Sequence, residues 1–162
     1  MKNKILDILK NDSRLTPKEI ASMLNVAEKK VKAEIAKLEK ENVILKYSVI
    51  VNDEIVNGDD TVIAFIEVKV TPERDKGFDN IAKRLQKFPE VQSIYLMSGA
   101  YDLLVVVKGD SLKDIARFVS GKLSPLGNVL STATHFLLKK YKENGIVMGQ
   151  DEEKSQRLNI TF

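Results

Sequence analysis

The sequence has no cysteine, no tryptophan and a single histidine, and none of its hydrophobic runs is long enough to cross a bilayer. Without cysteine there are no disulfides and no cysteine-ligated zinc site. One histidine, without a recognisable nucleophile beside it, is too little for a catalytic triad. No phosphate-binding loop or ligand cluster stands out either, so we expect neither an enzyme nor a cofactor or metal centre. The N-terminus breaks its apolar pattern with charge, unlike a signal peptide, which predicts a cytoplasmic protein without a membrane partner.

The lone histidine, His135, lies in an apolar stretch with no Asp, Glu or Cys close to it in the sequence. Metal binding and acid–base chemistry both need partner groups that this stretch does not supply. We therefore interpret His135 as a structural residue.

Positive charge is concentrated in the first third of the chain. The 162 residues carry a net charge of +3, and 43% of them are hydrophobic, as expected of one or two modest globular domains. Residues 1–52 hold 11 Lys and Arg against 7 Asp and Glu, whereas residues 53–162 hold 15 against 16. The excess positive charge therefore belongs to the N-terminal segment, where a nucleic-acid surface is to be sought.

Residues 16–45 have the pattern of two helices joined by a tight turn. Thr16 and Glu19 form a capping box, with Pro17 at the first helical position, so a helix is expected to begin at Thr16. Asn25, a residue that tolerates positive φ, stands where that helix must end. A further amphipathic helix is expected at residues 2–11, which makes a three-helix head.

The second helix of the pair begins at Glu28 and combines an apolar stripe with a basic outer surface. Val31, Ile35 and Leu38 repeat at helical spacing. Two helices joined by a short turn, the second of them basic outside, are typical of a helix-turn-helix that reads the DNA major groove. The alternative is an ordinary solvated surface, because four glutamates nearly cancel the lysines. We favour DNA binding, and the predicted contacts on this helix are Lys29, Lys30, Lys32 and Lys37.

Two short β-type runs follow the helices, at residues 43–45 and 48–51. They predict a small wing hairpin in which Lys46 contacts phosphate. The winged helix-turn-helix domain is thus placed at residues 1–52, and the polar, acidic stretch 53–60 is interpreted as a linker.

Residues 61–140 alternate between strand and helix periods. Strands are expected at 61–71, 91–98, 102–108 and 129–139, and helices at 78–88 and 112–123. The order βαββαβ predicts a ferredoxin-like domain, with two helices on one face of an antiparallel sheet, so the fold class is α+β. These strands lack the basic and clustered aromatic residues of an RNA-binding sheet.

The second face of this sheet is also expected to be apolar, because Ile63 and Phe65 point away from the helices. Either a second copy of the chain or the chain's own C-terminal tail, residues 141–162, must cover it. We favour a homodimer, which also supplies the two-fold symmetry of paired DNA half-sites. Within the tail, Leu158, Ile160 and Phe162 alternate as in a short edge strand.

The chain resembles the Lrp/AsnC, or feast/famine, transcriptional regulators over most of its length. Residues 98–102 resemble the glycine-x-tyrosine-aspartate signature between the second and third strands of the family's effector domain. The positions that resemble the family's winged helix-turn-helix are Asp7 to Leu9, Asn11 to Thr16, Glu19 to Ala21, Leu24, Val26, Val31, Ile35, Leu38, Glu39, Val43 and Ile44. The resemblance implies a dimer or a larger ring of dimers. It also implies double-stranded DNA as partner of the heads and a small effector, commonly an amino acid, held by the C-terminal domains.

The loop of Gly99, Ala100, Tyr101 and Asp102 has two interpretations. Spacing alone favours a plain turn, in which Asp102 accepts hydrogen bonds from nearby backbone N–H groups. With the resemblance, the loop becomes the best candidate for effector binding. Gly99 would let a ligand approach the backbone, and Asp102 would accept from an ammonium group or orient the loop. Two further candidates are Thr132 and Thr134, although β-branched residues also simply fill strands.

Three features depart from the family pattern. Ala27 stands where members often have a Ser or Thr helix cap, a difference of about 1 kcal/mol. Ala33 and Glu34 stand where members often have arginines, which removes bidentate base readers and leaves lysines suited to phosphate. The tail past residue 142 is longer than the family core requires.

Two functions are compatible with these patterns. The favoured one is a DNA-binding transcriptional regulator of the Lrp/AsnC type, modulated by a small effector such as an amino acid. The alternative is a ligand-sensing or assembly module whose helix-turn-helix binds a protein partner, which the near-neutral charge of the second helix permits.

Overall fold

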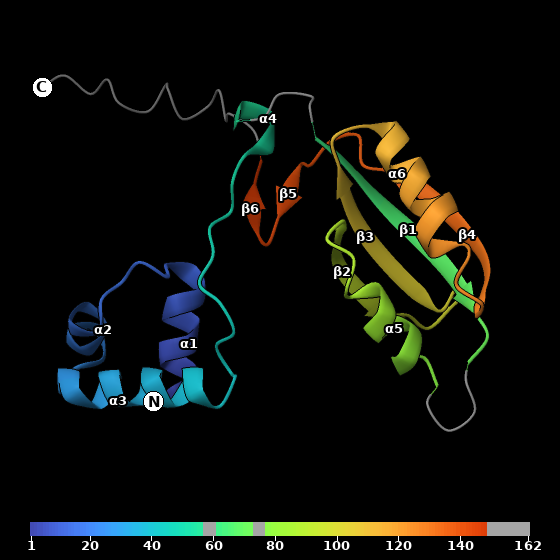
Figure 1. The fold of residues 1–162 in the computed structure, drawn as a ribbon. Coiled ribbons are helices and arrows are strands. Elements are labelled where there is room, and N and C mark those ends of the chain that lie inside the picture. The colour runs from blue at the N-terminus through green and yellow to red at the C-terminus, as the bar shows by residue number, and fades with distance from the viewer. Residues whose placement is uncertain (57–60, 73–76, 149–162) are drawn as a thin grey trace, which may run out of the picture. The chain divides into compact units, whose positions relative to one another are not determined.

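The computed structural model describes residues 1–56, 61–72 and 77–148. It divides into two compact units, Met1–Ile50 and a second one that begins at Val51 (Figure 1). In the described part of the chain, no helix is both long and apolar enough to span a membrane. The two units are considered separately below.

The N-terminal unit contains α1 (Lys2–Asn11), α2 (Pro17–Leu24) and α3 (Glu28–Lys40). The expected three-helix head is confirmed. Its small core gathers one apolar stripe from each helix, and its buried members are Ile5, Leu9, Ile20, Ala21 and Val31.

Local signals fix the ends of α2. The Thr16 hydroxyl accepts from the Glu19 N–H at 3.3 Å, and the Glu19 carboxylate accepts from the Thr16 N–H at 2.7 Å. This is the capping box predicted from the sequence. Asn25 ends the helix in the left-handed region, with φ of 52°, and turns the chain toward α3.

The predicted wing hairpin is wrong, because residues 43–52 contain no strand. Asn42 has a positive φ of 54°, and the N–H groups of Val43 and Ile44 donate to the Leu38 carbonyl at 2.9 and 3.1 Å. These bonds cap the C-terminus of α3 instead of starting a ladder. The two positions between the β-type runs are also occupied by Lys46 and Tyr47, whereas a two-residue hairpin turn requires glycine or asparagine.

The C-terminal unit is built on a four-stranded antiparallel sheet in the order β2-β3-β1-β4. Its elements follow the predicted βαββαβ order, which confirms the ferredoxin-like fold; they are β1 (Val62–Val70), α5 (Asp79–Leu85), β2 (Val91–Leu96), β3 (Leu103–Gly109), α6 (Leu112–Phe118) and β4 (Val129–Phe136). The expected second helix is shorter than predicted. It continues as a π-helical turn, η1 (Val119–Leu123), closed by the Ser124 N–H on the Val119 carbonyl at 2.8 Å.

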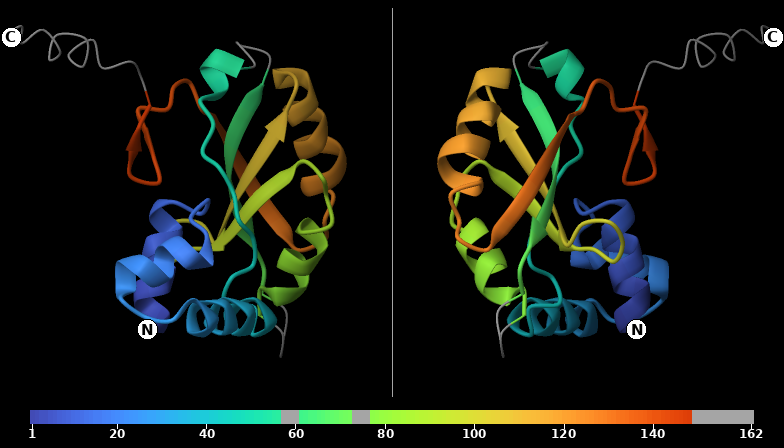
Figure 2. Two further views of the ribbon diagram at one scale, coloured as in Figure 1. Left: turned by 90° about the vertical axis from the view of Figure 1, so that its left-hand side faces the viewer. Right: turned by 90° about the vertical axis from the view of Figure 1, so that its right-hand side faces the viewer.

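Helices α5 and α6 cover one face of the sheet (Figure 2). The strands alternate accordingly, since every second residue of β1 and β3 is buried against the helices. Thirteen buried residues make this core, which is larger than the core of the head; among them are Ile66 and Val68 from β1, Val105 from β3, and Phe118 from α6.

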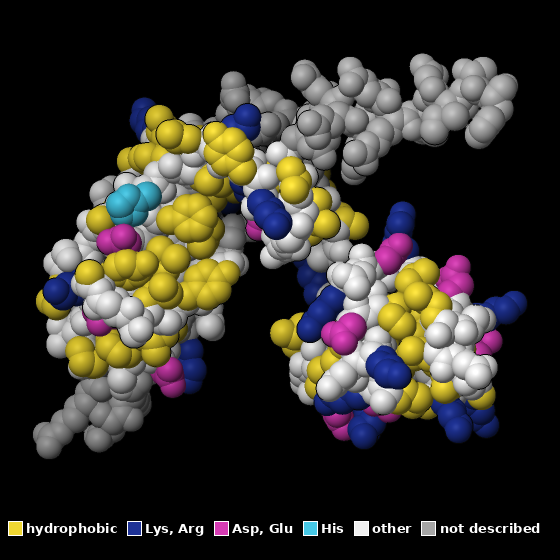
Figure 3. Space-filling model, turned by 180° about the vertical axis from the view of Figure 1, so that it is seen from behind, with side chains coloured by type: hydrophobic (Ala, Val, Ile, Leu, Met, Phe, Trp, Pro, Cys, Tyr) yellow, Lys and Arg dark blue, Asp and Glu magenta, His cyan; other side chains and the backbone are white. Residues whose placement is uncertain are grey.

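The opposite face of the sheet, called the outer sheet face below, is not covered by α5 or α6. The strand registers place on it Ile63, Phe65, Glu67 and Lys69 of β1, Leu104, Val106 and Lys108 of β3, Tyr95 of β2, and Ala133 and His135 of β4. Its central side chains are half-buried, whereas Ala133, His135 and Tyr95 are exposed. Figure 3 shows hydrophobic side chains gathered on this side of the unit, with the single histidine among them.

The chain after β4 contains a small hairpin within the segment that the sequence had suggested to be a tail. Strand β5 (Lys142–Glu143) pairs with β6 (Ile146–Val147). The turn between them, Asn144-Gly145, has φ values of 46° and 86°, as a tight hairpin turn requires. The predicted edge strand at Leu158 to Phe162 lies outside the described residues. Within the predicted linker, Asp53–Val56 forms the short helix α4.

Candidate DNA-binding and effector-binding surfaces

The N-terminus of α3 has no side-chain cap. Ala27 occupies the cap position with extended backbone angles, and no side chain accepts a hydrogen bond from the first turn. The missing side-chain cap is what the sequence predicted from Ala27 at this position. Unpaired N–H groups at the start of a helix favour an approaching anion such as phosphate.

All four predicted lysines of α3 are exposed, but they differ in their neighbours. Lys32 pairs with Glu28 at 2.7 Å, and Lys37 lies 3.9 Å from Glu41. The hydrogen bond from Lys32, followed by its charge, lowers the pKa of Glu28. Lys29 and Lys30 form no ion pair with any residue in the described ranges. The first turn of α3 therefore presents two uncompensated positive charges beside its uncapped N–H groups.

Lys46 is exposed in the extended segment after α3 rather than in a wing. The neighbouring Tyr47 hydroxyl donates to the Glu39 carboxylate at 2.9 Å, which holds this segment against the C-terminal half of α3. Partial burial, together with the Glu39 carboxylate, raises the pKa of Tyr47. Lys46 thus belongs to the same unit as the α3 lysines, at the opposite end of the helix.

The loop between β2 and β3 is fastened to β1 by Asp102. The Asp102 carboxylate accepts from the Val70 N–H at 2.9 Å, and the Asp102 N–H donates to the Val68 carbonyl at 3.1 Å. A third bond closes the loop, from the Met97 N–H to the Asp102 carbonyl at 2.8 Å. One carboxylate oxygen of Asp102 is therefore engaged by the backbone of β1, a strand distant in the sequence, and not by a nearby N–H group as the turn interpretation expected.

The tip of the loop is open. Gly99 has φ of 145°, a conformation that strains any residue with a Cβ, and a Cβ added there would meet nothing within 4 Å. Ala100 is exposed and Tyr101 is half-buried. The loop thus combines a rigid base at Asp102 with free space around Gly99.

The two threonines stand apart from this loop. Thr132 and Thr134 are half-buried on β4, where they pair with Val68 and Ile66 of β1. Because β1 lies between β3 and β4, the structure separates both hydroxyls from the loop by the width of one strand. Thr132 shares its row with Val68, whose carbonyl binds the loop, and Thr134 lies two residues farther along the strand.

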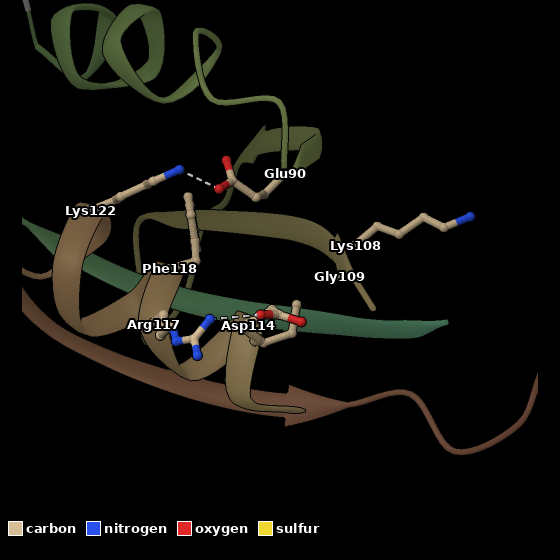
Figure 4. Close-up of a pocket in the computed structure, with 8 residues that line it drawn as sticks. Glu90, Lys108, Gly109, Asp114, Arg117, Phe118 and Lys122 are labelled. Atoms are coloured by element: carbon tan, nitrogen blue, oxygen red, sulfur yellow. Dashed lines mark hydrogen bonds and ion pairs between the residues drawn. The ribbon is translucent and has the colours of Figure 1, made fainter. Parts of the chain in front are cut away.

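A recess of about 240 Å³ lies at the other end of these strands (Figure 4). Its charged lining is largely paired, since Lys122 binds Glu90 and Arg117 lies 3.3 Å from Asp114. The hydrogen bond from Lys122 lowers the pKa of Glu90. Because it lies at the opposite end of the strands, the recess is distinct from the loop at residues 97–102. Of the cations that line it, Lys108 is the one that forms no ion pair with a described carboxylate.

One contact was missed in the sequence. His135 Nε2 lies 3.3 Å from Glu67 Oε1 on the outer sheet face. The two residues are far apart in the chain, and only the pairing of β1 with β4 brings them together. His135 therefore has an acidic neighbour in space, although none lies close to it in the sequence. The described residues contain no cluster of His, Asp or Glu suited to a metal ion.

Comparison with known families agrees with both units. Residues 2–44 match a winged helix-turn-helix DNA-binding domain, and residues 63–147 match the Lrp/AsnC ligand binding domain. The chain belongs to the Lrp/AsnC family of transcriptional regulators. The second match extends past the predicted domain boundary at residue 140 and includes the β5–β6 hairpin.

Individual relatives cover nearly the whole chain. YugG of Bacillus subtilis, an uncharacterized HTH-type transcriptional regulator, is 51% identical over 93% of this chain and 92% of its own. A proline dehydrogenase transcriptional activator of Rhizobium radiobacter is 27% identical over 88% and 90% of the two chains. The predicted function as a DNA-binding transcriptional regulator of the Lrp/AsnC type is confirmed. The alternative of a protein-binding helix-turn-helix finds no support in these relatives.

Solved structures share the fold. A transcriptional regulator of Neisseria meningitidis in complex with L-methionine has a TM-score of 0.71 and 25% identity, over 88% of this chain and 90% of that one. AsnC of Escherichia coli has a TM-score of 0.69 and 20% identity, over 88% and 93%, and at that identity the likeness concerns the fold alone.

Proposed function

We propose that this Lrp/AsnC regulator acts in the cytoplasm as a homodimer, or a ring of dimers. In this proposal it binds double-stranded DNA through the first turn of α3 and responds to a small amino acid held beside the loop at residues 97–102. The observation that carries the proposal is the first turn of α3. In that turn Lys29 and Lys30 are exposed and form no ion pair within the described ranges, and the helix N-terminus has no side-chain cap. Helix α3 is the second helix of the helix-turn-helix, the one that enters the major groove.

The DNA contact is expected to be mainly electrostatic. Ala33 and Glu34 provide no bidentate reader of a base edge on the outer side of α3. Lysines instead neutralise phosphates as point charges and release counterions. Lys32 and Lys37, already paired with glutamates, and Lys46 beyond the helix would add smaller contributions.

The outer sheet face is the proposed dimer interface. It is apolar at its centre and lies opposite the face that α5 and α6 cover. Its charged side chains are Glu67, which lies against His135, and Lys69 and Lys108 at opposite ends of the face. Two copies related by a two-fold axis place the same patch on itself, which requires a patch of low net charge. A dimer also supplies two heads for two half-sites of DNA.

The effector proposal is supported by the geometry of the loop and by the methionine complex of the Neisseria relative. Asp102 ties the base of the loop to β1, and the space around Gly99 leaves room for a ligand against the backbone. In this arrangement Asp102 positions the loop, and its second carboxylate oxygen remains available to an ammonium group. Ala100 and Tyr101 would line the site, with Thr132 and Thr134 more distant.

Calorimetry with each of the twenty amino acids, in the presence and absence of DNA from upstream of the protein's own gene, tests this proposal. An effector that changes DNA affinity must itself bind with an affinity changed by the same factor when DNA is present. Binding of at least one amino acid, altered by DNA, is expected. If none of the twenty binds, the loop is a turn and the regulator works without an amino-acid effector.

A further inference from the structure

The outer sheet face contains a glutamate, Glu67, that lies against the single histidine of the chain, His135. Glu67 and His135 approach to 3.3 Å across β1 and β4. Their side chains are 36% and 59% exposed, so solvent reaches both groups in the isolated unit. Histidine is the side chain that ordinarily gains or loses a proton between pH 6 and pH 8.

The surroundings of the pair are apolar. Phe65 lies opposite His135 in the register, and Ala133 lies opposite Glu67. On the next strand, Leu104 and Val106 pair with Glu67 and Phe65. A second copy placed on this patch would therefore remove the carboxylate and the imidazole from water together with their apolar neighbours.

The other titratable side chains on this face are two lysines and a tyrosine. By register they are Lys69 of β1, Lys108 of β3 and Tyr95 of β2. Lysine and tyrosine side chains do not change their charge between pH 6 and pH 8. His135 is also the only histidine of the chain. Among the described residues of this face, His135 is thus the one side chain of a type that ordinarily titrates in this range.

We propose that protonation of His135 strengthens the association of two copies through the outer sheet face, so that the regulator assembles more tightly at pH 6 than at pH 8. This inference rests on the dimer interface proposed above. It adds to that interface a dependence on the pH of the surrounding solution, carried by the pair of Glu67 with His135.

The direction follows from the charge that must be desolvated. With His135 protonated, Glu67 is buried as one member of an ion pair of zero net charge. With His135 neutral, the same carboxylate enters the apolar interface without its ion-pair partner, since neither Lys69 nor Lys108 forms an ion pair with Glu67 in the described structure. Burying a carboxylate in that state is costly. The dimer therefore binds more protons than two separate chains do. By linkage, each proton taken up makes the logarithm of the association constant fall by one for each unit of rising pH.

The test is sedimentation equilibrium of the full chain at pH 6, 7 and 8, at fixed ionic strength and over a dilution series. We expect the dimer to associate at least about tenfold more tightly at pH 6 than at pH 8, because an average uptake of only about half a proton per dimer over two pH units gives that factor. His135→Gln should remove this dependence. This variant keeps the α-amino group, which also titrates near this range. It is therefore the matched control for any pH dependence that does not come from His135.

A second variant tests the pair itself. In Glu67→Gln a protonated His135 would be the uncompensated charge, so association should weaken as pH falls, the reverse of the natural protein. The two levels of the proposal fail separately. A chain that is monomeric at every pH overturns the dimer interface and this inference together. A dimer whose affinity is independent of pH, or whose pH dependence survives His135→Gln, overturns this inference alone.

Discussion

The two units of the protein have surfaces of contrasting chemical character. The head has a core of five buried residues and an outer helix covered with charge, whereas the sheet unit has a core of thirteen and leaves an apolar face open. Charge on exposed lysines favours a highly charged partner and is screened by salt. An apolar face favours another apolar face, and salt has little effect on it. The difference supports the proposal that DNA binds to the head and that two copies associate through the sheet, and it predicts that salt separates the two activities.

The largest effect is expected from a charge placed in the middle of the outer sheet face. Phe65→Asp would bury an unpaired carboxylate between two copies, so the dimer should weaken by about a hundredfold or more. Light scattering over a dilution series measures the change, with circular dichroism to verify the fold. Leu112→Asp is the matched control, because it makes a similar change at an exposed position of α6, on the covered side. If both variants dimerise normally, the interface lies elsewhere.

A smaller effect is expected at the effector loop. Asp102→Ala removes the acceptor of the Val70 N–H and should abolish the change in DNA affinity caused by an amino acid, a change typically of about 5- to 150-fold. Asp102→Asn keeps a side-chain oxygen for that N–H and should retain most of the response, if Asp102 acts by positioning. Loss of the response in both variants would instead assign Asp102 a charge contact with the ligand. Anisotropy of labelled DNA with and without the amino acid decides between them.

The next effect concerns the salt dependence of DNA binding. Replacing Lys29 and Lys30 together with Ala should flatten the slope of log affinity against log salt by about 1.8, or about 0.9 for each lost phosphate contact. The same change at Lys37, which already faces Glu41, should flatten it less. Lys83→Ala with Lys113→Ala is the control in the sheet unit, where both lysines are exposed. Equal slopes for all of these proteins would remove α3 from the DNA interface.

The smallest effect is a pH dependence confined to the head. Hydrogen bonds from the Arg14 side chain and N–H lower the pKa of Asp12 to about 2. A lowered pKa stabilises the folded state above the ordinary value near 4, and this contribution disappears as pH falls from about 4 to about 2. Asp12→Asn should therefore reduce the acid sensitivity of thermal unfolding in that window. Asp7→Asn, at an exposed position of α1, should leave it unchanged.

The sequence predicted those parts of the fold whose signals are local. The capping box of Thr16 and Glu19 and the left-handed Asn25 each act within a few residues, and the structure has both as expected. Strand alternation from Val62 to Val70 likewise predicted the covered face of the sheet. Such signals can be recognised in the sequence because neighbouring residues alone decide the local backbone conformation.

Predictions failed where the outcome depends on partners. The β-type run at 48–51 formed no strand, because no described segment pairs with it. The hairpin at 142–147 was not predicted although Asn144-Gly145 is a strong turn signal, since strands of two residues show too little alternation to be recognised. The contact of Glu67 with His135 could not be predicted, because it depends on the register between β1 and β4. The bond of Asp102 to Val70 likewise depends on tertiary structure.

A gel shift on DNA from upstream of the protein's own gene tests the central claim most directly. The natural protein and the Lys29→Ala, Lys30→Ala double variant are compared at low and at physiological salt, with and without amino acids. We predict a shifted band for the natural protein that weakens with salt, responds to at least one amino acid, and is much fainter for the variant. Equal shifts for both proteins at both salt concentrations would contradict DNA recognition through the first turn of α3.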